Sequence, residues 1–337
     1  MRISDIGEFG LIEILSRQLP KPSKAVVRGI GDDAAVIQGS GTNSTLLTTD
    51  MLIEDIHFTR KYCSAYNIGW KSLAVNVSDI GAMGGLPTVG VVSLAIPVNW
   101  TVEELTELYR GLGAAALFYG VSIVGGDTVK SLQGLTINVA LLGEAEPDSV
   151  VYRSGAKSGD AILVTGTLGE SAAGLARLQN PEIILPAGCG EALAQRYRQP
   201  MAQVMAGYNL AKAGLVNAMN DISDGLASEI HEICKASGVG CHLQAENIPL
   251  AEATKLLAKS LGIDPLDWAL FGGEDFQLVV TLDPGRVNQA QRLLTSLGVS
   301  ATLVGEITSG TDVLLVQASG EEKLQSRGFN HFTQQDD

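Results

Sequence analysis

Aspartates recur in this sequence at points where a hydrophobic stretch meets glycine, serine or threonine. Asp32 and Asp33 are adjacent in RGIGDDAAVI, where they interrupt an apolar run. The others are Asp50 in TTD, Asp79 in NVSD, Asp127 in GGD, and Asp221 and Asp224 in NDISDG. Turn aspartates usually lie in polar loops, whereas these interrupt the most hydrophobic parts of the chain. The pattern favours one shared ligand site over a set of unrelated turns.

A shared site of this kind needs positive charge. Two carboxylates about 4 Å apart repel by about 4 kcal/mol at the effective dielectric of a partly buried site, and several together would exceed an ordinary protein's stability. Carboxylates with Ser and Thr hydroxyls are all-oxygen ligands, which select hard cations: Mg²⁺ first, with Ca²⁺ or Mn²⁺ as alternatives. Because Mg²⁺ shares its ligand shell with substrate phosphates, the pattern predicts a phosphate-binding site.

Composition excludes several other classes of protein. The net charge is −14 over 337 residues, which disfavours nucleic acid as a partner. The N-terminus carries acids where a signal peptide needs basic residues, and the most apolar stretch, AAALFYGVSIVGG, is too short and glycine-broken to span a bilayer. We therefore expect no membrane association and a cytoplasmic location. The four cysteines form no C-x-x-C pair and the four histidines are scattered, so we expect reduced thiols and no zinc site.

The elements that must position the aspartates alternate between strand and helix. Strands are expected at 25–37 (two, with a turn between them), 44–53, 87–97, 121–128 and 134–147. Helices are expected at 68–85 and 101–120, and Thr101 with Glu104 forms a capping box at the start of the second. Asp50 and Asp127 are expected at strand ends, where the ligand-binding edge of an α/β sheet forms.

The loop AEPDSVVYRSGAKSGD is the best candidate for a domain boundary, which predicts domains at 1–148 and 149–337. The second half again mixes both kinds of element. Helices are expected at 170–179, 203–219, 226–237, 253–262 and 285–298, with a strand at 278–282 after the acidic loop GGED at 272–275. The fold class is therefore α/β (α+β). Strand and turn, not a helix, follow GIGDDA, which argues against a dinucleotide fold, and no P-loop motif occurs.

Seven motifs, in this order, resemble those of the thiamine-monophosphate kinases: GIGDDAAV, TTDMLIEDIHF, KSLAVNVSDIGAMGG, VGGDT, RSGAKSGDAILVTGTLGESAAGL, DISDGL and GGEDFQL. The resemblance runs from Gly7 to Phe332, and its looser elements are shared by the wider aminoimidazole-ribonucleotide synthetase-like ATP-binding superfamily. It implies a two-domain synthetase-like fold with an N-terminal mixed sheet that pairs across a homodimer. The C-terminal α/β domain then completes a substrate site in the groove between the domains.

The activity that this resemblance implies is ATP-dependent phosphorylation of thiamine monophosphate to thiamine diphosphate, assisted by several Mg²⁺ ions. The acceptor phosphate is already ionised near neutral pH, so no general base is required. By position, the metal ligands are Asp33, Thr48, Thr49, Asp50, Asp79, Asp127, Asp221 and Asp224, with Asp50 and Asp127 the most critical. The implied ATP contacts are Gly126, Asp127, Arg153 and Ser223. The implied thiamine-phosphate contacts are His57, Glu274 and Phe329.

Alternatives remain open at this point. One is another ATP-dependent enzyme of the same superfamily, such as the synthetase of purine synthesis. The hydrogenase-maturation relatives need a C-terminal cysteine, whereas this chain ends HFTQQDD. A third reading is a non-catalytic divalent-metal-binding protein. Residue chemistry alone favours a structural role for His57, and it makes Lys71 and Lys130 surface or helix-end charges.

Overall fold

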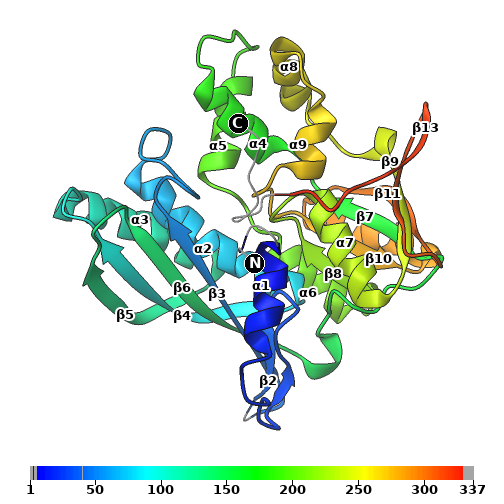
Figure 1. Cartoon of the computed structure of the whole chain (residues 1–337), viewed down its shortest axis with the longest axis horizontal. Coiled ribbons are helices and arrows are strands. Elements are labelled where there is room, and N and C mark those ends of the chain that lie inside the picture. Colours follow the sequence, from blue (N-terminus) through cyan, green and yellow to red (C-terminus); the bar gives the residue numbers. More distant parts are fainter. Residues whose placement is uncertain (1–2, 4–5, 40, 329–337) are drawn as a thin grey trace.

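The computed structural model describes residues 3, 6–39 and 41–328, and Phe329 lies outside them. The described chain forms two α/β units, each built on one β-sheet (Figure 1). This confirms the predicted fold class. The strands of the first sheet end at Ala145 and those of the second begin at Ala161. A boundary between residues 148 and 149 lies in the connecting segment, and we retain it as a proposal.

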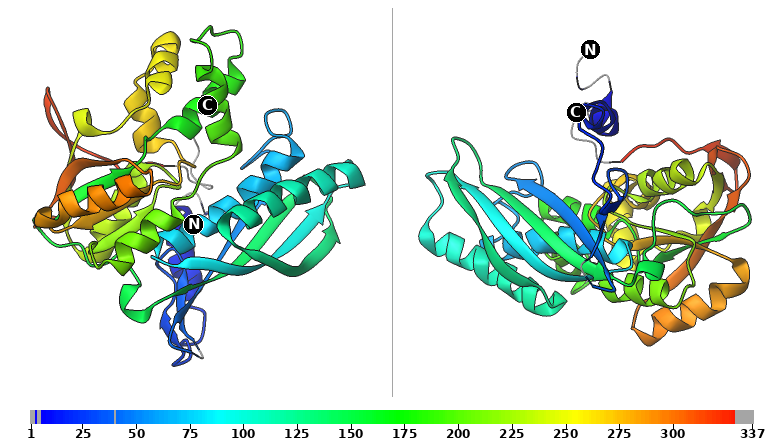
Figure 2. Two further views of the ribbon diagram at one scale, coloured as in Figure 1. Left: turned by 180° about the vertical axis from the view of Figure 1, so that it is seen from behind. Right: turned by 90° about the horizontal axis from the view of Figure 1, so that it is seen from below.

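The first sheet has the strand order β1-β2-β3-β6-β4-β5. Its strands are β1 (Val26–Arg28), β2 (Ala35–Gln38), β3 (Ser44–Ile53), β4 (Leu86–Ile96), β5 (Ser122–Lys130) and β6 (Thr136–Ala145). Only β4 and β5 pair in parallel, so the sheet is mixed. Helices α2 (Ala65–Ala82) and α3 (Val102–Tyr119) cover one face (Figure 2). The other face leaves large apolar side chains exposed, among them Leu47, Met51, Val91 and Leu142.

The second sheet has the order β13-β12-β9-β11-β7-β10-β8. Its strands are β7 (Ala161–Thr165), β8 (Ala218–Asp221), β9 (Gly240–Gln244), β10 (Leu278–Leu282), β11 (Ala301–Thr308), β12 (Val313–Gln317) and β13 (Gly320–Lys323). Every residue of β7 and β10 is buried, because helices cover both faces of the sheet. Ile162 packs with Ile230 on one face, and Leu163 packs with Leu210 and Leu294 on the other.

Eight further α-helices complete the described chain. They are α1 (Gly7–Ser16), α4 (Glu170–Gln179), α5 (Cys189–Arg198), α6 (Val204–Lys212), α7 (Leu226–Ser237), α8 (Glu252–Leu261), α9 (Pro265–Phe271) and α10 (Val287–Ser296). Short 3-10 turns lie at Pro147–Ser149, Ala245–Asn247 and Pro284–Arg286. None of the helices in the described residues combines the length and hydrophobicity needed to cross a lipid bilayer.

Close backbone packing joins the two units. A Cβ atom on Gly81 of α2 would lie 2.9 Å from Val204 Cα, and one on Gly207 of α6 would lie 2.0 Å from Gly81 O. Glycine at both positions therefore lets α2 of the first unit pack directly against α6 of the second. As a result, the end of α2 that carries Asp79 lies beside strand β8 of the second sheet.

Several predicted boundaries are wrong for local reasons. The helix expected at 68–85 begins at Ala65, because the Ser64 hydroxyl caps it by accepting a bond from Asn67 N. The helix expected at 203–219 ends at Lys212, and Gly214 adopts φ +60° before strand β8 begins at Ala218. Asp50 and Asp127 lie inside β3 and β5, not at strand ends. The predicted capping box of α3 is confirmed.

Candidate active site

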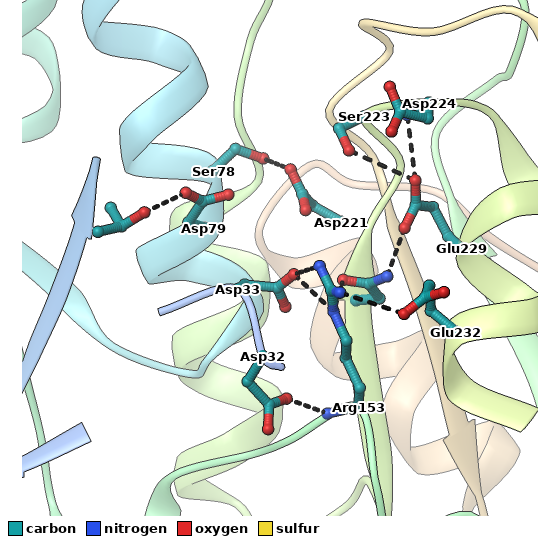
Figure 3. Close-up of polar contacts among 12 residues, drawn as sticks. Asp32, Asp33, Ser78, Asp79, Arg153, Asp221, Ser223, Asp224, Glu229 and Glu232 are labelled. Carbon is teal, nitrogen blue, oxygen red and sulfur yellow. Dashed lines mark hydrogen bonds and ion pairs between the residues drawn. The ribbon is translucent and has the colours of Figure 1, made fainter. Parts of the chain in front are cut away.

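Aspartates from both units meet where α2 packs against β8. Asp33 lies in the turn between β1 and β2, Asp79 on α2, and Asp221 at the end of β8. Figure 3 shows these three carboxylates approaching one another from separate elements. Asp50 joins them from β3, where its side chain is hydrogen-bonded to that of Asp79 and its backbone N donates to Asn76 Oδ1 at 3.1 Å. The predicted convergence of distant aspartates on one place is thus present for these four.

We define the acidic cluster as these four aspartates together with Asp224, which lies between β8 and α7, and burial raises the pKa of all five carboxyl groups. Burial is the largest cause for Asp33, whose pKa rises to about 7 although Arg153 opposes the shift. Burial also raises the pKa of Asp50 and Asp221 to about 6 each. Asp79 has a pKa well above its usual range, first because it is buried and then because Asp50, Asp221 and Asp33 repel it. The negative charge of the ionised cluster is therefore only partly balanced by positively charged protein groups nearby.

Arg153 supplies positive charge to this cluster. Its Nε donates to Asp33 Oδ1 at 3.0 Å and to Asn220 Oδ1 at 3.2 Å, and its Nη2 also donates to Asp33. Its Nη1 lies 3.5 Å from a Glu232 carboxylate oxygen (Figure 3). The Arg153 guanidinium group is thus paired with the Asp33 carboxylate on one side and lies close to the Glu232 carboxylate on the other. The predicted contact between Arg153 and ATP stays a prediction.

The donor set suits a hard divalent cation. All the converging groups are oxygens, and Asp33 Oδ2 is buried without a hydrogen-bond partner. Within the described residues, however, no three Asp, Glu, His or Cys side chains are already placed to hold a metal ion. The fit to Mg²⁺ therefore rests on ligand chemistry and an unpaired buried oxygen, and the carboxylates must adjust to form a coordination shell.

Strand geometry separates the two predicted threonine ligands. Thr48 is buried, and its hydroxyl donates to Asp79 Oδ2 at 2.5 Å. Thr49 points to the opposite face of the sheet, as alternation along a strand requires, and its hydroxyl donates to Val139 O at 2.9 Å. Thr48 therefore belongs with the acidic cluster, whereas the Thr49 hydroxyl is bonded to strand β6.

Asp127 and Gly126 do not join the cluster within one chain. Pairing runs from Asp50 through Val139 and Val92 to Gly126, which is three strand spacings, or about 14 Å. Asp127 is exposed on the edge strand β5, and its Oδ1 accepts a bond from Thr128 N at 2.8 Å. A Cβ on Gly126 would lie 1.7 Å from Val92 O, so any other residue at this position would clash with the neighbouring strand β4.

A cavity of about 540 Å³ opens beside the acidic cluster. Its lining includes Asp50 and Asp224 together with three residues that the sequence assigned to substrates: Ser223, His57 and Glu274. The volume lies within the range of pockets that bind small molecules. His57 is oriented by the β3 backbone, because its Nδ1 accepts a bond from Ile53 N at 3.0 Å. Metal-type and substrate-type residues therefore share one cavity.

The loop that carries Glu274 is held on both sides. Glu274 N donates to Ser223 O at 2.7 Å, and Glu274 adopts φ +67°, a conformation that non-glycine residues rarely take. The adjacent Asp275 carboxylate accepts bonds from Gly169 N and Ser171 N at 2.6 and 3.1 Å, at the start of α4. Backbone strain is thus maintained at a cavity-lining position, which is common at functional sites.

The prediction for Lys71 is wrong. Its side chain is fully buried, its Nζ donates to Glu274 Oε2 at 2.7 Å, and it lies 4.0 Å from the centre of the Tyr197 ring. A buried ammonium requires such partners, and both come from the second unit. Lys130 is exposed at the end of β5, as predicted.

Sequence reasoning also missed Glu229. This residue of α7 is buried, and its carboxylate accepts bonds from Asn220 Nδ2 and Asp224 N at 2.5 and 3.1 Å. Burial first, and then repulsion by Asp224 and Asp221, raise its pKa well above the usual range. An acid in the first turn of the helix after DISDG was the available signal, because the carboxylate can reach back to the exposed N–H groups there.

Comparisons with known proteins show what this chain is similar to. The AIR synthase related protein N-terminal domain matches residues 31–145, and the corresponding C-terminal domain matches residues 157–316. The chain is 35% identical over 335 residues to the thiamine-monophosphate kinase of Bacillus subtilis, covering 97% of this chain and all of that protein. It is 36% identical over 333 residues to that of Aquifex aeolicus, covering 98% of this chain and all of that protein.

A solved structure gives the same result in three dimensions. The structure of AaThiL complexed with AMPPCP and TMP superposes with a TM-score of 0.86 at 37% identity, covering 98% of this chain and 99% of that one. Similarity therefore spans both units of the chain. The chain belongs to the thiamine-monophosphate kinase family of AIR synthase related proteins.

Proposed function

We propose that this protein transfers the γ-phosphoryl group of ATP to thiamine monophosphate and so produces thiamine diphosphate. The observation that carries the proposal is one cavity that joins the acidic cluster to His57 and Glu274. The full-length likeness to a structure complexed with AMPPCP and TMP supports the same pair of substrates.

The acidic cluster, with Thr48, would hold Mg²⁺ ions, which supply the charge that lets two anionic phosphates approach each other. The predicted ligands Thr49 and Asp127 are retained as proposals, although Thr49 directs its hydroxyl to β6 and Asp127 lies on the distant edge strand. Asp33 also holds Arg153, a forked cation suited to phosphate, beside the acidic cluster, although Arg153 is not among the residues that line the cavity. We propose that Arg153 and Ser223 contact ATP together with Gly126 and Asp127.

The acceptor end of the cavity needs positioning and no proton transfer. The attacking oxygen belongs to a phosphate that is already ionised at neutral pH, so a general base is unnecessary. His57 and Glu274 line the cavity and are proposed to orient thiamine monophosphate there. Phe329, which lies outside the described residues, is retained as a proposed contact with the same substrate.

We also propose that the protein acts as a homodimer in the cytoplasm. The uncovered face of the first sheet exposes Leu47, Met51, Val91 and Leu142, and the edge strand β5 exposes Val124 and Val129. An apolar face bordered by an unpaired edge strand is suited to a second copy of the chain. Because Asp127 lies about 14 Å from β3 within one chain, we propose that it completes the site of the partner subunit.

A coupled assay of ATP consumption tests the proposed activity. Thiamine monophosphate, free thiamine and simple phosphomonoesters are compared as acceptors, each with Mg²⁺ and with EDTA. We expect turnover with thiamine monophosphate and Mg²⁺ only. Turnover of ATP with a different acceptor would favour another synthetase of the superfamily. Metal-dependent stabilisation without any turnover would indicate a binding protein.

A further inference from the structure

A buried ion pair joins the two units at one side of the active-site cavity. The Lys71 side chain is 1% exposed and comes from α2, whereas that of Glu274 is 28% exposed and comes from the second unit. The Lys71 ammonium also packs on the Tyr197 ring, at 4.0 Å from its centre. Among the described residues, Glu274 is the one acid that lies within ion-pair distance of Lys71.

The geometry of helix α2 gives the distance from Lys71 of this ion pair to Asp79 of the acidic cluster. Lys71, Val75 and Asp79 follow one another at four-residue spacing, so they lie along one face of the helix. Eight residues at 1.5 Å each place Asp79 about 12 Å along the helix axis from Lys71. Val75 lines the cavity between them, with Asp50 and Glu274 also in its wall.

The ion pair changes what Glu274 can recognise. One carboxylate oxygen, Oε2, accepts the Lys71 bond, and the charge of the ammonium offsets that of the carboxylate. The strained backbone at Glu274 and the bonds of Asp275 to α4 hold the loop, so Lys71 fixes the remaining freedom of the side chain. A carboxylate held and neutralised in this way is better suited to accept an N–H group than to pair with a free cation.

We propose that Lys71 is a positioning residue that aims Glu274 at an N–H donor on the ring of the acceptor substrate. The acceptor class is a phosphomonoester that carries an amine-bearing heterocycle, with the phosphate toward the acidic cluster and the ring toward Glu274. The inference rests on the proposed function, and it assigns the aminopyrimidine of thiamine monophosphate to Glu274. Lys71 itself touches neither substrate.

Steady-state kinetics of four variants test this role: Lys71→Met, Lys71→Arg, Glu274→Gln and the double variant Lys71→Met with Glu274→Gln. We expect Lys71→Met to raise KM for thiamine monophosphate about tenfold, the value of one hydrogen bond to a charged group, while kcat and KM for ATP change little. Lys71→Arg restores part of the loss. The double variant is no worse than Lys71→Met alone, because both changes remove the same contact. Lys255→Met, at an exposed position on α8, is the matched control.

A phosphomonoester without the amine-bearing ring separates positioning from a structural role. We expect its low kcat/KM to be the same in the wild type and in Lys71→Met, whereas a structural defect lowers kcat/KM for both acceptors. An equal loss for both acceptors, or an unchanged KM for thiamine monophosphate, would overturn the inference. If Lys71→Met does not fold, Lys71→Arg and Glu274→Gln give the same comparison. Failure of the wild type to use thiamine monophosphate would instead overturn the proposed function.

Discussion

Replacing Asp79 with asparagine should stabilise the protein in the absence of divalent metal. Asp79 is the informative position because its carboxylate accepts a bond from Thr48 and forms no ion pair with any residue that the structure describes, so the replacement removes charge without breaking such a pair. One neighbouring carboxylate at about 4 Å costs about 4 kcal/mol at an effective dielectric of 20. Partial protonation of the cluster reduces this repulsion, so we expect Asp79→Asn to gain about 2–4 kcal/mol at pH 8 in EDTA.

The pH dependence of that gain follows from the raised pKa values. Between the unfolded and folded pKa values the folded state binds more protons than the unfolded chain, so stability falls as pH rises through this window. For Asp33 and Asp50 the window extends from about 4 up to about 7 and about 6, respectively. The shift at Asp50 alone, from 3.8 to about 6, corresponds to about 3 kcal/mol. Near pH 4 the wild-type cluster is protonated, and the advantage of Asp79→Asn should be small.

Urea unfolding at pH 4.5, 6 and 8 measures this effect, with EDTA or with Mg²⁺ present. Mg²⁺ should stabilise the wild type by about 2.7 kcal/mol at one hundred times its Kd, and should stabilise Asp79→Asn much less. Asp148→Asn, at an exposed position, is the control and should behave as the wild type. The reasoning is refuted if Asp79→Asn is less stable than the wild type at pH 8 in EDTA while Mg²⁺ stabilises both proteins equally.

Three further predictions concern turnover and stability. Asp50→Asn and Asp127→Asn should each abolish activity in the coupled assay. When the two variants are unfolded, mixed and refolded together, about a quarter of the wild-type activity should return, because half of the dimers then contain one intact site. If no activity returns, Asp127 does not contribute to the partner's site. His57→Ala should raise KM for thiamine monophosphate more than it lowers kcat, and a loss confined to kcat would indicate metal placement or chemistry instead. Glu274→Gln should lower the free energy of unfolding in urea by about 3 kcal/mol, because it leaves Lys71 buried and unpaired. Adding Lys71→Met should recover part of that loss. A loss that Lys71→Met does not change would argue against the ion pair.

The predictable parts of the fold were those with a local signal. The capping box at Thr101 and Glu104 marked the start of α3, and the apolar run at 44–53 marked β3. Strand β8 was mistaken for the end of a helix, because its four residues are too few to show a period of two and a helical segment precedes them. It pairs with β10 and packs against α2, and both of these elements are distant from it in sequence.

The acidic cluster was predictable in type and only partly in geometry. Acids beside glycine and serine in apolar surroundings identified Asp33, Asp79 and Asp221, and the structure brings them together. Asp127 has the same local signal, yet strand order places it three strands from Asp50, which no local pattern records. The Lys71–Glu274 pair was hidden for the same reason, because its partners lie 203 residues apart and meet only through the packing of α2.

The location of divalent metal tests the central claim most directly. Crystals grown with Mn²⁺, a non-hydrolysable ATP analogue and thiamine monophosphate would show each ion by its anomalous scattering. We predict anomalous peaks within bonding distance of oxygens from Asp33, Asp50, Asp79, Asp221 or Asp224, each also bound to a phosphate oxygen. Both substrates bound in the cavity with no ion at these aspartates would contradict a metal-assisted site.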